Sequence, residues 1–353
     1  MNDLDQLTVY EQVDRAGMRH RLENLHDQTE AAYRTAREFA RTLGEYSIKR
    51  IVVAAMGGSA MGAAFVQAAY QSAAALPVSI CRSYDLPAWV AGAETLVIVS
   101  SKSGNTEETL SACAEAIARK CPVIALTTGG VLAEQARIHR IPCCSYTADY
   151  TPREAVAWLT MPLIAILDTL MVIPDPDADV AEACSILREG ATTLGIGSPA
   201  RRNPAKRLAG QLVQHLPIIY GSGILAPVAQ RWKTVLNENA KMLAVCDELP
   251  ELNHNTIVGF EHDEQVWRRS IVIQLRSDHD HPRVSRRFDL TTRLMLEAGI
   301  NQDTVRARGR SALAQQMSLV QFGDWVSYYT AIMAGIDPTP AEVLDALKRE
   351  LNG

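Results

Sequence analysis

The stretch SKSGNT, residues 101–106, decides how the rest of the sequence is interpreted. It follows a short apolar run, TLVIVS at residues 95–100, and precedes a segment of helical character at residues 107–119. The order is a strand, a hydroxyl-rich loop and the start of a helix. Such an arrangement can form an anion cradle, because the hydroxyls of the loop and the unpaired backbone N–H groups of the first helical turn can surround an anion. Ser, Thr and Asn are also the usual residues at helix N-caps. Taken alone, the stretch fits phosphate binding or plain helix capping.

The composition is that of a chain that folds into globular domains. Its 353 residues suffice for two domains of ordinary size. A hydrophobic content of 47% and a charged content of 21% argue against disorder. The net charge of −5 offers no general attraction to nucleic acid or to an anionic membrane, so we expect neither as a partner. Any anion that the protein binds must therefore be bound by groups arranged locally around it, and not by the overall charge.

The cysteines and the N-terminal residues predict the cellular compartment of the protein. The seven cysteines show neither a CxxC pair nor regular spacing, and most lie within or beside apolar runs. We therefore expect reduced, mostly buried thiols in a cytoplasmic protein. The N-terminal MNDLDQLTVY is acidic and polar, which argues against a signal peptide, and the apolar runs are too short to span a bilayer.

The first half of the chain alternates apolar runs with helical segments. A helical region is expected over residues 1–45. Strands are expected at residues 51–55, 77–81, 95–100, 122–126 and 141–144, and helices at residues 60–74, 106–119, 131–139 and 154–172. This alternation predicts βαβ units, and so an α/β fold with a parallel sheet and helices on both faces.

The second half repeats this organisation. The segment VIPDPDAD at residues 172–179, with two prolines and three acids, is the best candidate for a domain boundary. After it, strands are expected at residues 217–220, 270–275 and 303–307, and helices at residues 179–193, 227–243, 283–298, 313–334 and 340–351. The similar openings IVVAAMGGSAMG and PIIYGSGILAPV indicate a duplicated domain. We predict an N-terminal helical segment at 1–45 and domains at 46–175 and 176–353, the first carrying the hydroxyl-rich stretch.

A second glycine-containing turn, Gly57-Gly58-Ser59, follows the first expected strand. Ligands of parallel sheets bind beyond the carboxyl ends of the strands, so both loops face one pocket if their strands are neighbours. The two glycines would let the backbone approach a ligand closely, and Ser59 adds a hydroxyl. A tight turn without a ligand is the alternative. The sequence GGSAMG departs from the dinucleotide fingerprint G-x-G-x-x-G, and no P-loop motif occurs.

The motifs together resemble a known family. GGSAMG after the first strand and SKSGNTEET after the third resemble the sugar isomerase (SIS) domain. Three later motifs resemble the two-domain bifunctional phosphoglucose/phosphomannose isomerases: Asn237-Glu238-Asn239, LNHN at residues 252–255, and Leu347-Lys348. The resemblance implies two SIS-type domains with extra N- and C-terminal helices. It also implies reversible isomerisation of glucose 6-phosphate or mannose 6-phosphate to fructose 6-phosphate, with no metal or other cofactor.

The resemblance assigns a role to each matching position. The sugar phosphate would be held by residues of the two loops: Gly57, Gly58, Ser59, Ser101, Ser103 and Thr106. Glu238 would be the base that moves a proton between C1 and C2, and Arg153 would stabilise the negative charge of the enediolate. His254 and Lys348 would assist ring opening. By the same resemblance, the protein is a homodimer in which His254 reaches the partner's site.

Each assignment has a structural alternative. Glu238 can be a solvent-facing helix residue that pairs with Lys241 at i+3. Arg153 can pair on the surface near a helix start. His254 can be a polar loop residue, and Lys348 can complement the dipole at the C-terminal end of its helix. Lys348 is the least secure position, because Arg349 beside it leaves the alignment open.

Two other functions stay open at this point. A non-catalytic sugar-phosphate sensor would keep the phosphate loops without needing Glu238, His254 or Arg153. An isomerase of another phosphosugar, such as an amino-sugar or heptose phosphate, would differ only in the pocket, for which Thr339 is a candidate lining residue. Lys102 is the departure from the family, whose members commonly have an uncharged residue between the two serines.

The run DHDHP at residues 278–282 resembles a metal site superficially. It joins an expected strand to an expected helix and lacks a helical i, i+4 pair of histidines. We therefore expect a solvated loop and no metal.

Overall fold

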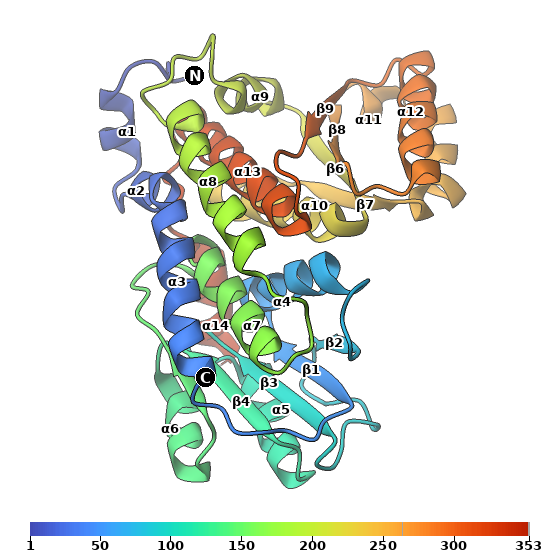
Figure 1. Ribbon diagram of the computed structural model, residues 1–353. Coiled ribbons are helices and arrows are strands. Elements are labelled where there is room, and N and C mark those ends of the chain that lie inside the picture. The colour runs from blue at the N-terminus through green and yellow to red at the C-terminus, as the bar shows by residue number, and fades with distance from the viewer. Residues whose placement is uncertain (263, 352–353) are drawn as a thin grey trace. The chain divides into compact units, whose positions relative to one another are not determined.

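The computed structural model describes residues 1–262 and 264–351, and these form two compact units. Unit A comprises Leu25–Ser185 and Ser311–Ala314. Unit B comprises Met1–Asn24, Ile186–Arg310 and the described residues from Gln315 onward. The helix α8 (Asp177–Leu194) begins in unit A and ends in unit B. Figure 1 labels the helices and strands of both units.

Unit A is built around a five-stranded parallel sheet in the order β2-β1-β3-β4-β5. Its strands are β1 (Arg50–Ala55), β2 (Val78–Cys81), β3 (Thr95–Ser100), β4 (Val123–Thr127) and β5 (Cys143–Ser145). Its helices are α3 (Leu25–Ala40), α4 (Gly57–Tyr70), α5 (Glu107–Ala118), α6 (Gly130–His139) and α7 (Val156–Thr169).

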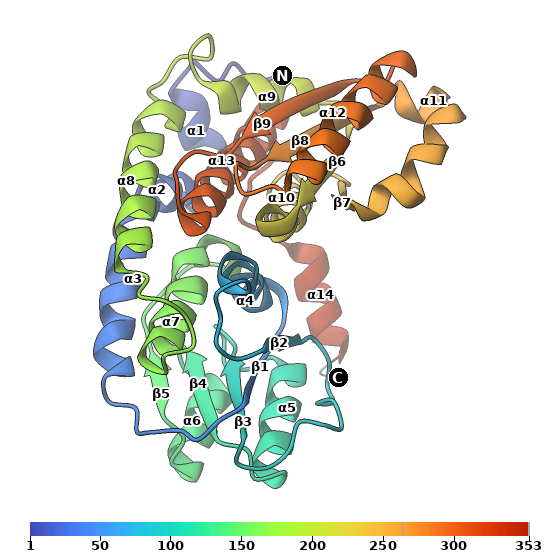
Figure 2. The ribbon, with the colours of Figure 1, turned by 45° about the vertical axis from the view of Figure 1, so that its right-hand side comes forward.

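Apolar layers on both faces explain why this sheet forms. Val52 of β1 and Val97 of β3 pack in a core with Ala112 of α5 and Leu132 of α6. Alternate strand residues point to the other face, where α4 packs against the sheet and against α7 (Figure 2). A sheet buried on both faces needs nearly continuous apolar strands, which is why the short β-branched runs in the sequence located it.

Gly62 in α4 sets the distance between α4 and α7. A Cβ at this position would lie 2.2 Å from the carbonyl oxygen of Leu159, which is backbone and cannot move aside easily. We expect Gly62→Ala to destabilise unit A by about 1–3 kcal/mol, the usual range for overpacking. The measurement is urea unfolding. Gly44→Ala is the control, because nothing lies within 4 Å of its added Cβ. Equal unfolding midpoints for both variants would contradict the expectation.

Unit B contains a four-stranded parallel sheet in the order β7-β6-β8-β9. Its strands are β6 (Leu216–Ser222), β7 (Val245–Leu249), β8 (Ser270–Arg276) and β9 (Gln302–Arg306). Its helices include α1 (Thr8–Val13), α2 (Met18–Glu23), α9 (Pro204–Leu212), α10 (Ala226–Asn239), α11 (Glu264–Trp267), α12 (Pro282–Glu297), α13 (Ala312–Ala334) and α14 (Glu342–Leu351).

Short 3₁₀ helices complete the described elements: η1 (Pro152–Glu154), η2 (Gly223–Leu225), η3 (Glu251–His254) and η4 (Thr256–Glu261). On one face of the unit B sheet, Ile218 and Val272 pack with Phe288 and Met295 of α12. The expected α/β class, with parallel sheets, flanking helices and extra helices at both ends, is confirmed.

Several sequence-based element bounds were wrong. The strand β7 was not predicted, because its residues VCDEL form a mostly exposed edge strand without an apolar run. The helix expected at 227–243 ends at Asn239, and Lys241 beyond it adopts a left-handed φ of 55°. The expected helical region 1–45 is three separate helices, and residues 41–49 are not helical. The fifth strand of unit A begins at Cys143, two residues later than expected.

The first residues of the chain are fixed to unit B by buried polar contacts. The ammonium of Lys206 donates to the carbonyl oxygen of Leu4 at 2.8 Å, although Lys206 is only 3% exposed. The hydroxyl of Tyr328 donates to Asp14 at 3.0 Å. None of the described helices combines the length and the apolar character that crossing a membrane requires.

Candidate active site

The two glycine- and serine-containing loops begin side by side. Their strands β1 and β3 are hydrogen-bonded neighbours, with Ala55 opposite Ser100. The other neighbour of β1 is β2, so the strand order reverses between β1 and β3. The condition that the strands of the two loops are neighbours is met, so both loops start at the carboxyl end of the sheet, where open α/β sheets bind ligands.

The first loop differs from the expected turn. The helix α4 begins at Gly57, which has a left-handed φ of 49°, so Gly58 and Ser59 belong to its first helical turn. The predicted helix started only at residue 60. Ser59 is 4% exposed, whereas Gly57 is exposed. The backbone N–H groups of this first turn have no partner inside the helix and point toward the edge of the sheet.

The second loop, residues 101–106, carries a small hydroxyl network. Ser101 Oγ lies 2.9 Å from Thr106 Oγ1 and accepts the Gly104 N–H at 3.1 Å. Ser103 Oγ accepts the Asn105 N–H at 3.2 Å. Thr106 occupies the N-cap of α5, but its side chain makes no capping hydrogen bond. The plain-cap interpretation therefore lacks the contact that defines it.

The backbone of this loop is braced by the loop after β4. The carbonyl oxygen of Lys102 accepts from Thr128 N–H at 3.1 Å and from Thr128 Oγ1 at 2.8 Å. Gly104 has a φ of 69°, and a Cβ there would lie 1.9 Å from the carbonyl oxygen of Gly129. A side chain at position 104 is excluded on both grounds. Sequence analysis missed this brace, although TTGG at residues 127–130 follows a strand as the other two loops do.

Arg153 lies on η1, next to the start of α4. It is only 8% exposed, which contradicts the alternative that it is a surface residue. Thr151 and Glu154 form a capping box, with Thr151 N–H donating to the Glu154 carboxylate at 3.0 Å. A Cβ on Gly58 would lie 3.3 Å from the carbonyl oxygen of Pro152. Glycine at position 58 therefore lets the Arg153 segment approach the first loop.

Lys102, a residue of the second loop, is half-buried. Burial lowers the pKa of its ammonium, and the carboxylates of Asp149 and Glu154 oppose that shift. These two carboxylates flank Arg153 in the sequence. The side chain that departs from the family pattern therefore lies within electrostatic range of two carboxylates, and one of them, Glu154, is next to Arg153 in the sequence.

Glu238 is held between two anchored asparagines at the end of α10. Asn237 donates its side-chain N–H to the carbonyl oxygen of Met242 at 2.8 Å, closing the turn after the helix. Asn239 is 3% exposed and donates to Ser327 Oγ of α13 at 2.9 Å. Lys241 donates to the backbone carbonyl of Glu238 at 2.6 Å. The NEN motif therefore fixes the backbone on both sides of a half-buried carboxylate.

The helix α10 itself is fastened to α13. Arg231 and Asp324, both buried, form a two-point ion pair with N–O distances of 3.0 and 2.7 Å. The indole N–H of Trp232 donates to the carbonyl oxygen of Leu319 at 2.8 Å. These contacts make the helix that carries Glu238 a rigid support.

His254 lies at the opposite end of the unit B sheet from Glu238. The helix α10 begins after the carboxyl end of β6 and returns toward the point where β7 starts, with Glu238 near its last turn. β7 then leads back to the carboxyl end of the sheet, and His254 follows in η3, exposed. The four residue steps along β7 alone cover roughly 13 Å at ~3.3 Å per residue.

Lys348 lies in the last turn of α14 and is exposed, as is Arg349. This position fits a cation that complements the helix dipole. The segment that leads into α14 is tied to the Glu238 turn, because Lys241 donates to the carbonyl oxygen of Pro338 at 3.1 Å. Thr339 follows this tie directly.

The predicted residues other than Lys348, which lies in the last turn of α14, therefore fall into three groups. Unit A brings together the two loops and the segment of Arg153. In unit B, Glu238 and the start of the α14 segment share one region, while His254 lies at the other end of the sheet. No group of three or more His, Cys, Asp and Glu side chains in the described ranges is placed to hold a metal ion.

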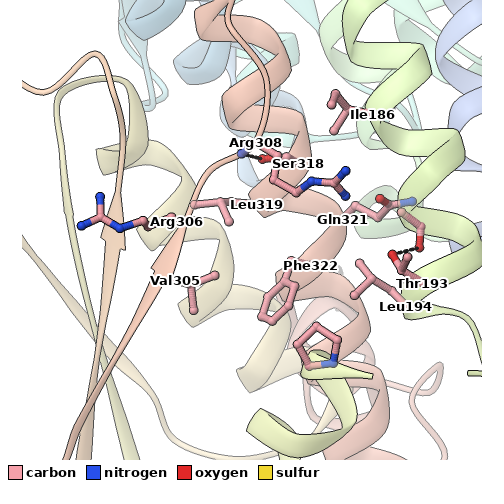
Figure 3. A pocket seen from close by; sticks show the side chains of 12 residues that line it. Ile186, Thr193, Leu194, Val305, Arg306, Arg308, Ser318, Leu319, Gln321 and Phe322 are labelled. Carbon is pink, nitrogen blue, oxygen red and sulfur yellow. Dashed lines mark hydrogen bonds between the residues drawn. The ribbon is translucent and has the colours of Figure 1, made fainter. Parts of the chain in front are cut away.

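A separate cavity in unit B contains none of the predicted site residues. It has a volume of about 230 Å³ and lies between α8, β9 and α13 (Figure 3). Its walls are largely apolar, with Leu194, Val305 and Phe322 among them. Two of its polar side chains bond within the protein: Arg308 pairs with Glu189 at 2.5 Å, and Gln321 donates to the carbonyl oxygen of Leu187 at 2.9 Å.

Comparison with known families defines the class of protein. Residues 46–173 match the model of the SIS domain, and residues 201–351 match that of the bacterial phospho-glucose isomerase C-terminal SIS domain. Two solved structures share the fold. A glucose-6-phosphate isomerase like protein from Thermus thermophilus is 20% identical, with a TM-score of 0.66 over 99% of both chains. Tagatose-6-phosphate ketose/aldose isomerase from Escherichia coli is 16% identical, with a TM-score of 0.65 over 97% of both chains. The chain is a two-domain SIS protein.

The curated relatives are more specific. The chain is 36% identical to the bifunctional phosphoglucose/phosphomannose isomerase of Caldicellulosiruptor bescii, over 93% of this chain and 97% of the relative. It is 34% identical to the protein of the same name from Thermoplasma acidophilum, over 87% and 91% of the two chains. A D-glucosamine-6-phosphate 4-epimerase from Sulfolobus acidocaldarius is 31% identical over 52% of this chain and 56% of the relative. The chain belongs to the bifunctional phosphoglucose/phosphomannose isomerase family, as the sequence motifs implied.

Proposed function

We propose that this protein catalyses the reversible aldose–ketose isomerisation of glucose 6-phosphate and mannose 6-phosphate to fructose 6-phosphate. Similarity to the bifunctional isomerase of Caldicellulosiruptor bescii over 93% of the chain carries this conclusion. The local geometry supports it, since two donor-rich loops and a buried arginine segment meet at the ligand-binding edge of a parallel sheet. The proposed domains extend over residues 46–175 and 176–353, and we propose the cytoplasm as the compartment.

The phosphate group would be bound by the two loops of unit A. Its donors would be the first-turn N–H groups near Gly57 and Gly58 and four hydroxyls, those of Ser59, Ser101, Ser103 and Thr106. The phosphate does not react, so its binding energy serves to orient the sugar carbons. Because the loop backbone is braced by Thr128, its hydroxyls are already positioned before the substrate arrives.

Proton transfer would be performed by Glu238. Isomerisation removes a weakly acidic proton next to a carbonyl and returns it to the neighbouring carbon, which one carboxylate over C1 and C2 can do. The resulting enediolate carries negative charge, and the guanidinium of Arg153 would stabilise it. This carboxylate chemistry requires no metal. His254 and Lys348 would move protons between the ring oxygen and O1 during ring opening.

We propose that the working form is a homodimer in which His254 serves the site of the partner. Ring opening and proton transfer occur on adjacent atoms, so a histidine and a carboxylate must both touch one hexose. Within one chain, the length of β7 separates the ends of the sheet at which His254 and Glu238 lie. A histidine supplied by a second copy removes this conflict.

Replacing the phosphate-binding hydroxyls tests the role of unit A. We expect Ser101→Ala combined with Ser103→Ala to raise KM for glucose 6-phosphate roughly 10²- to 10⁴-fold, because two hydrogen bonds to a charged group are removed and each contributes about 1.5–3 kcal/mol. The kcat should change less, since the phosphate does not react. Ser72→Ala, at an exposed position of the same unit, is the control. A KM equal to that of the control would leave the loop with a capping role only.

A substrate panel separates the proposed function from its alternatives. Glucose 6-phosphate, mannose 6-phosphate and glucosamine 6-phosphate are assayed side by side, with a chelator present. We expect the first two to yield fructose 6-phosphate. Binding of all three without turnover would favour a non-catalytic sensor, and conversion of glucosamine 6-phosphate alone would favour an enzyme that acts on another phosphosugar, as one relative's name suggests.

A further inference from the structure

Two loops of unit B repeat the arrangement of the proposed phosphate loops of unit A, because they also begin at the carboxyl ends of neighbouring strands. β6 and β8 are neighbours in its sheet, as β1 and β3 are in unit A. The residue that opens the helical segment after β6, Gly223, has a φ of 48°, and its counterpart after β1, Gly57, has a φ of 49°. A serine follows each of the second strands directly: Ser277 after β8 and Ser101 after β3.

The two serine loops share one backbone hydrogen bond, from the N–H three residues on to the carbonyl oxygen of the serine. In unit A, the Gly104 N–H donates to the carbonyl oxygen of Ser101 at 3.1 Å. In unit B, the Asp280 N–H donates to the carbonyl oxygen of Ser277 at 3.3 Å. Asp280 therefore stands at the same sequence distance from its serine as Gly104 does, although only Gly104 has a positive φ, and it adds a carboxylate to the loop.

This carboxylate bridges the ends of the two strands. The hydroxyl of Ser222, the last residue of β6, donates to one carboxylate oxygen of Asp280, and the N–H of Ser277 donates to the other at 3.1 Å. Burial raises the pKa of Asp280, while these two donors and the charge of Arg276 act in the opposite direction. The expectation of a solvated loop at residues 278–282 was wrong at Asp280, which is turned inward, although Asp278 and His279 are exposed.

We propose that the loops after β6 and β8 form a second anion cradle that Asp280 keeps occupied, and that the cradle accepts inorganic phosphate once this carboxylate is removed. The comparison with unit A rests on the proposed phosphate loops there, whereas the donors around Asp280 stand on their own contacts. In the native chain, the Asp280 carboxylate fills the cradle of unit B, so only the loops of unit A would bind phosphate. The duplicated domain is thereby free to supply Glu238 and His254.

The opened cradle would bind phosphate more weakly than unit A. The helix α12 begins with Pro282, which has no N–H to donate, and His281 already caps the helix by accepting the Arg283 N–H at 3.1 Å. The remaining donors are the Ser222 hydroxyl and the Ser277 N–H. Arg276 supplies nearby positive charge, although it is paired with Asp289 at 3.0 Å.

Asp280→Gly, which reproduces the glycine found at position 104, is the variant that tests the proposal. It is made in a chain that also carries Ser101→Ala and Ser103→Ala, and inorganic phosphate is titrated by calorimetry. We expect this chain to bind about one phosphate more than its parent. Asp278→Gly, which removes an equal charge from an exposed neighbour, should bind no more than the parent. No gain from Asp280→Gly, or an equal gain from Asp278→Gly, would overturn the proposal.

A second measurement covers the case in which Asp280→Gly folds poorly. Asp280→Ala, Asp280→Gly and Asp278→Gly, each in the chain that carries Ser101→Ala and Ser103→Ala, are melted in increasing phosphate and in chloride of the same ionic strength. Selective stabilisation by phosphate, absent in Asp278→Gly, supports the cradle, and equal effects of both salts contradict it. Failure of the proposed function is visible separately: phosphate binding to the otherwise native chain would then be unaffected by Ser101→Ala and Ser103→Ala.

Discussion

Glu238→Gln is expected to lower kcat for glucose 6-phosphate and mannose 6-phosphate by about 10³-fold, within the 10²- to 10⁴-fold that a positioned acid–base group contributes. The amide has nearly the shape of the carboxylate but cannot take a proton from carbon. Asn237 and Asn239 keep their contacts with Met242 and Ser327, so the backbone at position 238 should not move.

Binding and folding controls make this result specific to proton transfer. Phosphate binding should be unchanged in Glu238→Gln, because the proposed phosphate loops belong to unit A. Glu297→Gln on α12 removes an exposed carboxylate that pairs only loosely with Arg293, at 3.6 Å, and should leave kcat near its native value. Near-native turnover in Glu238→Gln would show that another group moves the proton.

Mixed dimers are expected to regain activity that neither parent variant has. Glu238→Gln and His254→Ala chains with different tags are co-expressed, and the mixed dimers are isolated. If His254 serves the partner's site, each mixed dimer has one site with both native residues and one with neither. We therefore expect about half the native turnover per dimer from an isologous pair. If both residues serve the same chain, no site in the mixed dimer is complete, and its activity should stay as low as that of the parents.

The fold was largely predictable because its strands are buried on both faces. Runs such as TLVIVS leave an unbroken apolar signal, and the polar residues that end each run mark the edge where loops begin. The strand β7 carries no such signal, because it is an edge strand, and an edge strand can be exposed and can mix polar with apolar residues. The end of α10 was misplaced for a related reason: Lys241 takes the left-handed conformation that a glycine usually marks.

The candidate site was predictable in its parts but not in its arrangement. The motifs named Ser101, Glu238 and His254, yet only the strand order of unit B places the last two at opposite ends of a sheet. Two features depend on contacts between loops that are distant along the chain. Thr128 braces the loop of Lys102, and the hydroxyl of Ser222 donates to the carboxylate of Asp280. A sequence pattern of single hydroxyls and acids does not specify such contacts.

Isomerisation in deuterium oxide tests the central claim most directly. Transfer of a proton by Glu238 passes through an acid that exchanges with solvent. Fructose 6-phosphate should therefore acquire deuterium at C1, and the aldoses equilibrated by the enzyme should acquire it at C2, as read by proton NMR. The label should accumulate as the reaction cycles, and Glu238→Gln should slow it as strongly as it slows turnover. Complete equilibration of the sugars without any deuterium on carbon would mean that hydrogen moves directly between C1 and C2, and would contradict the carboxylate mechanism.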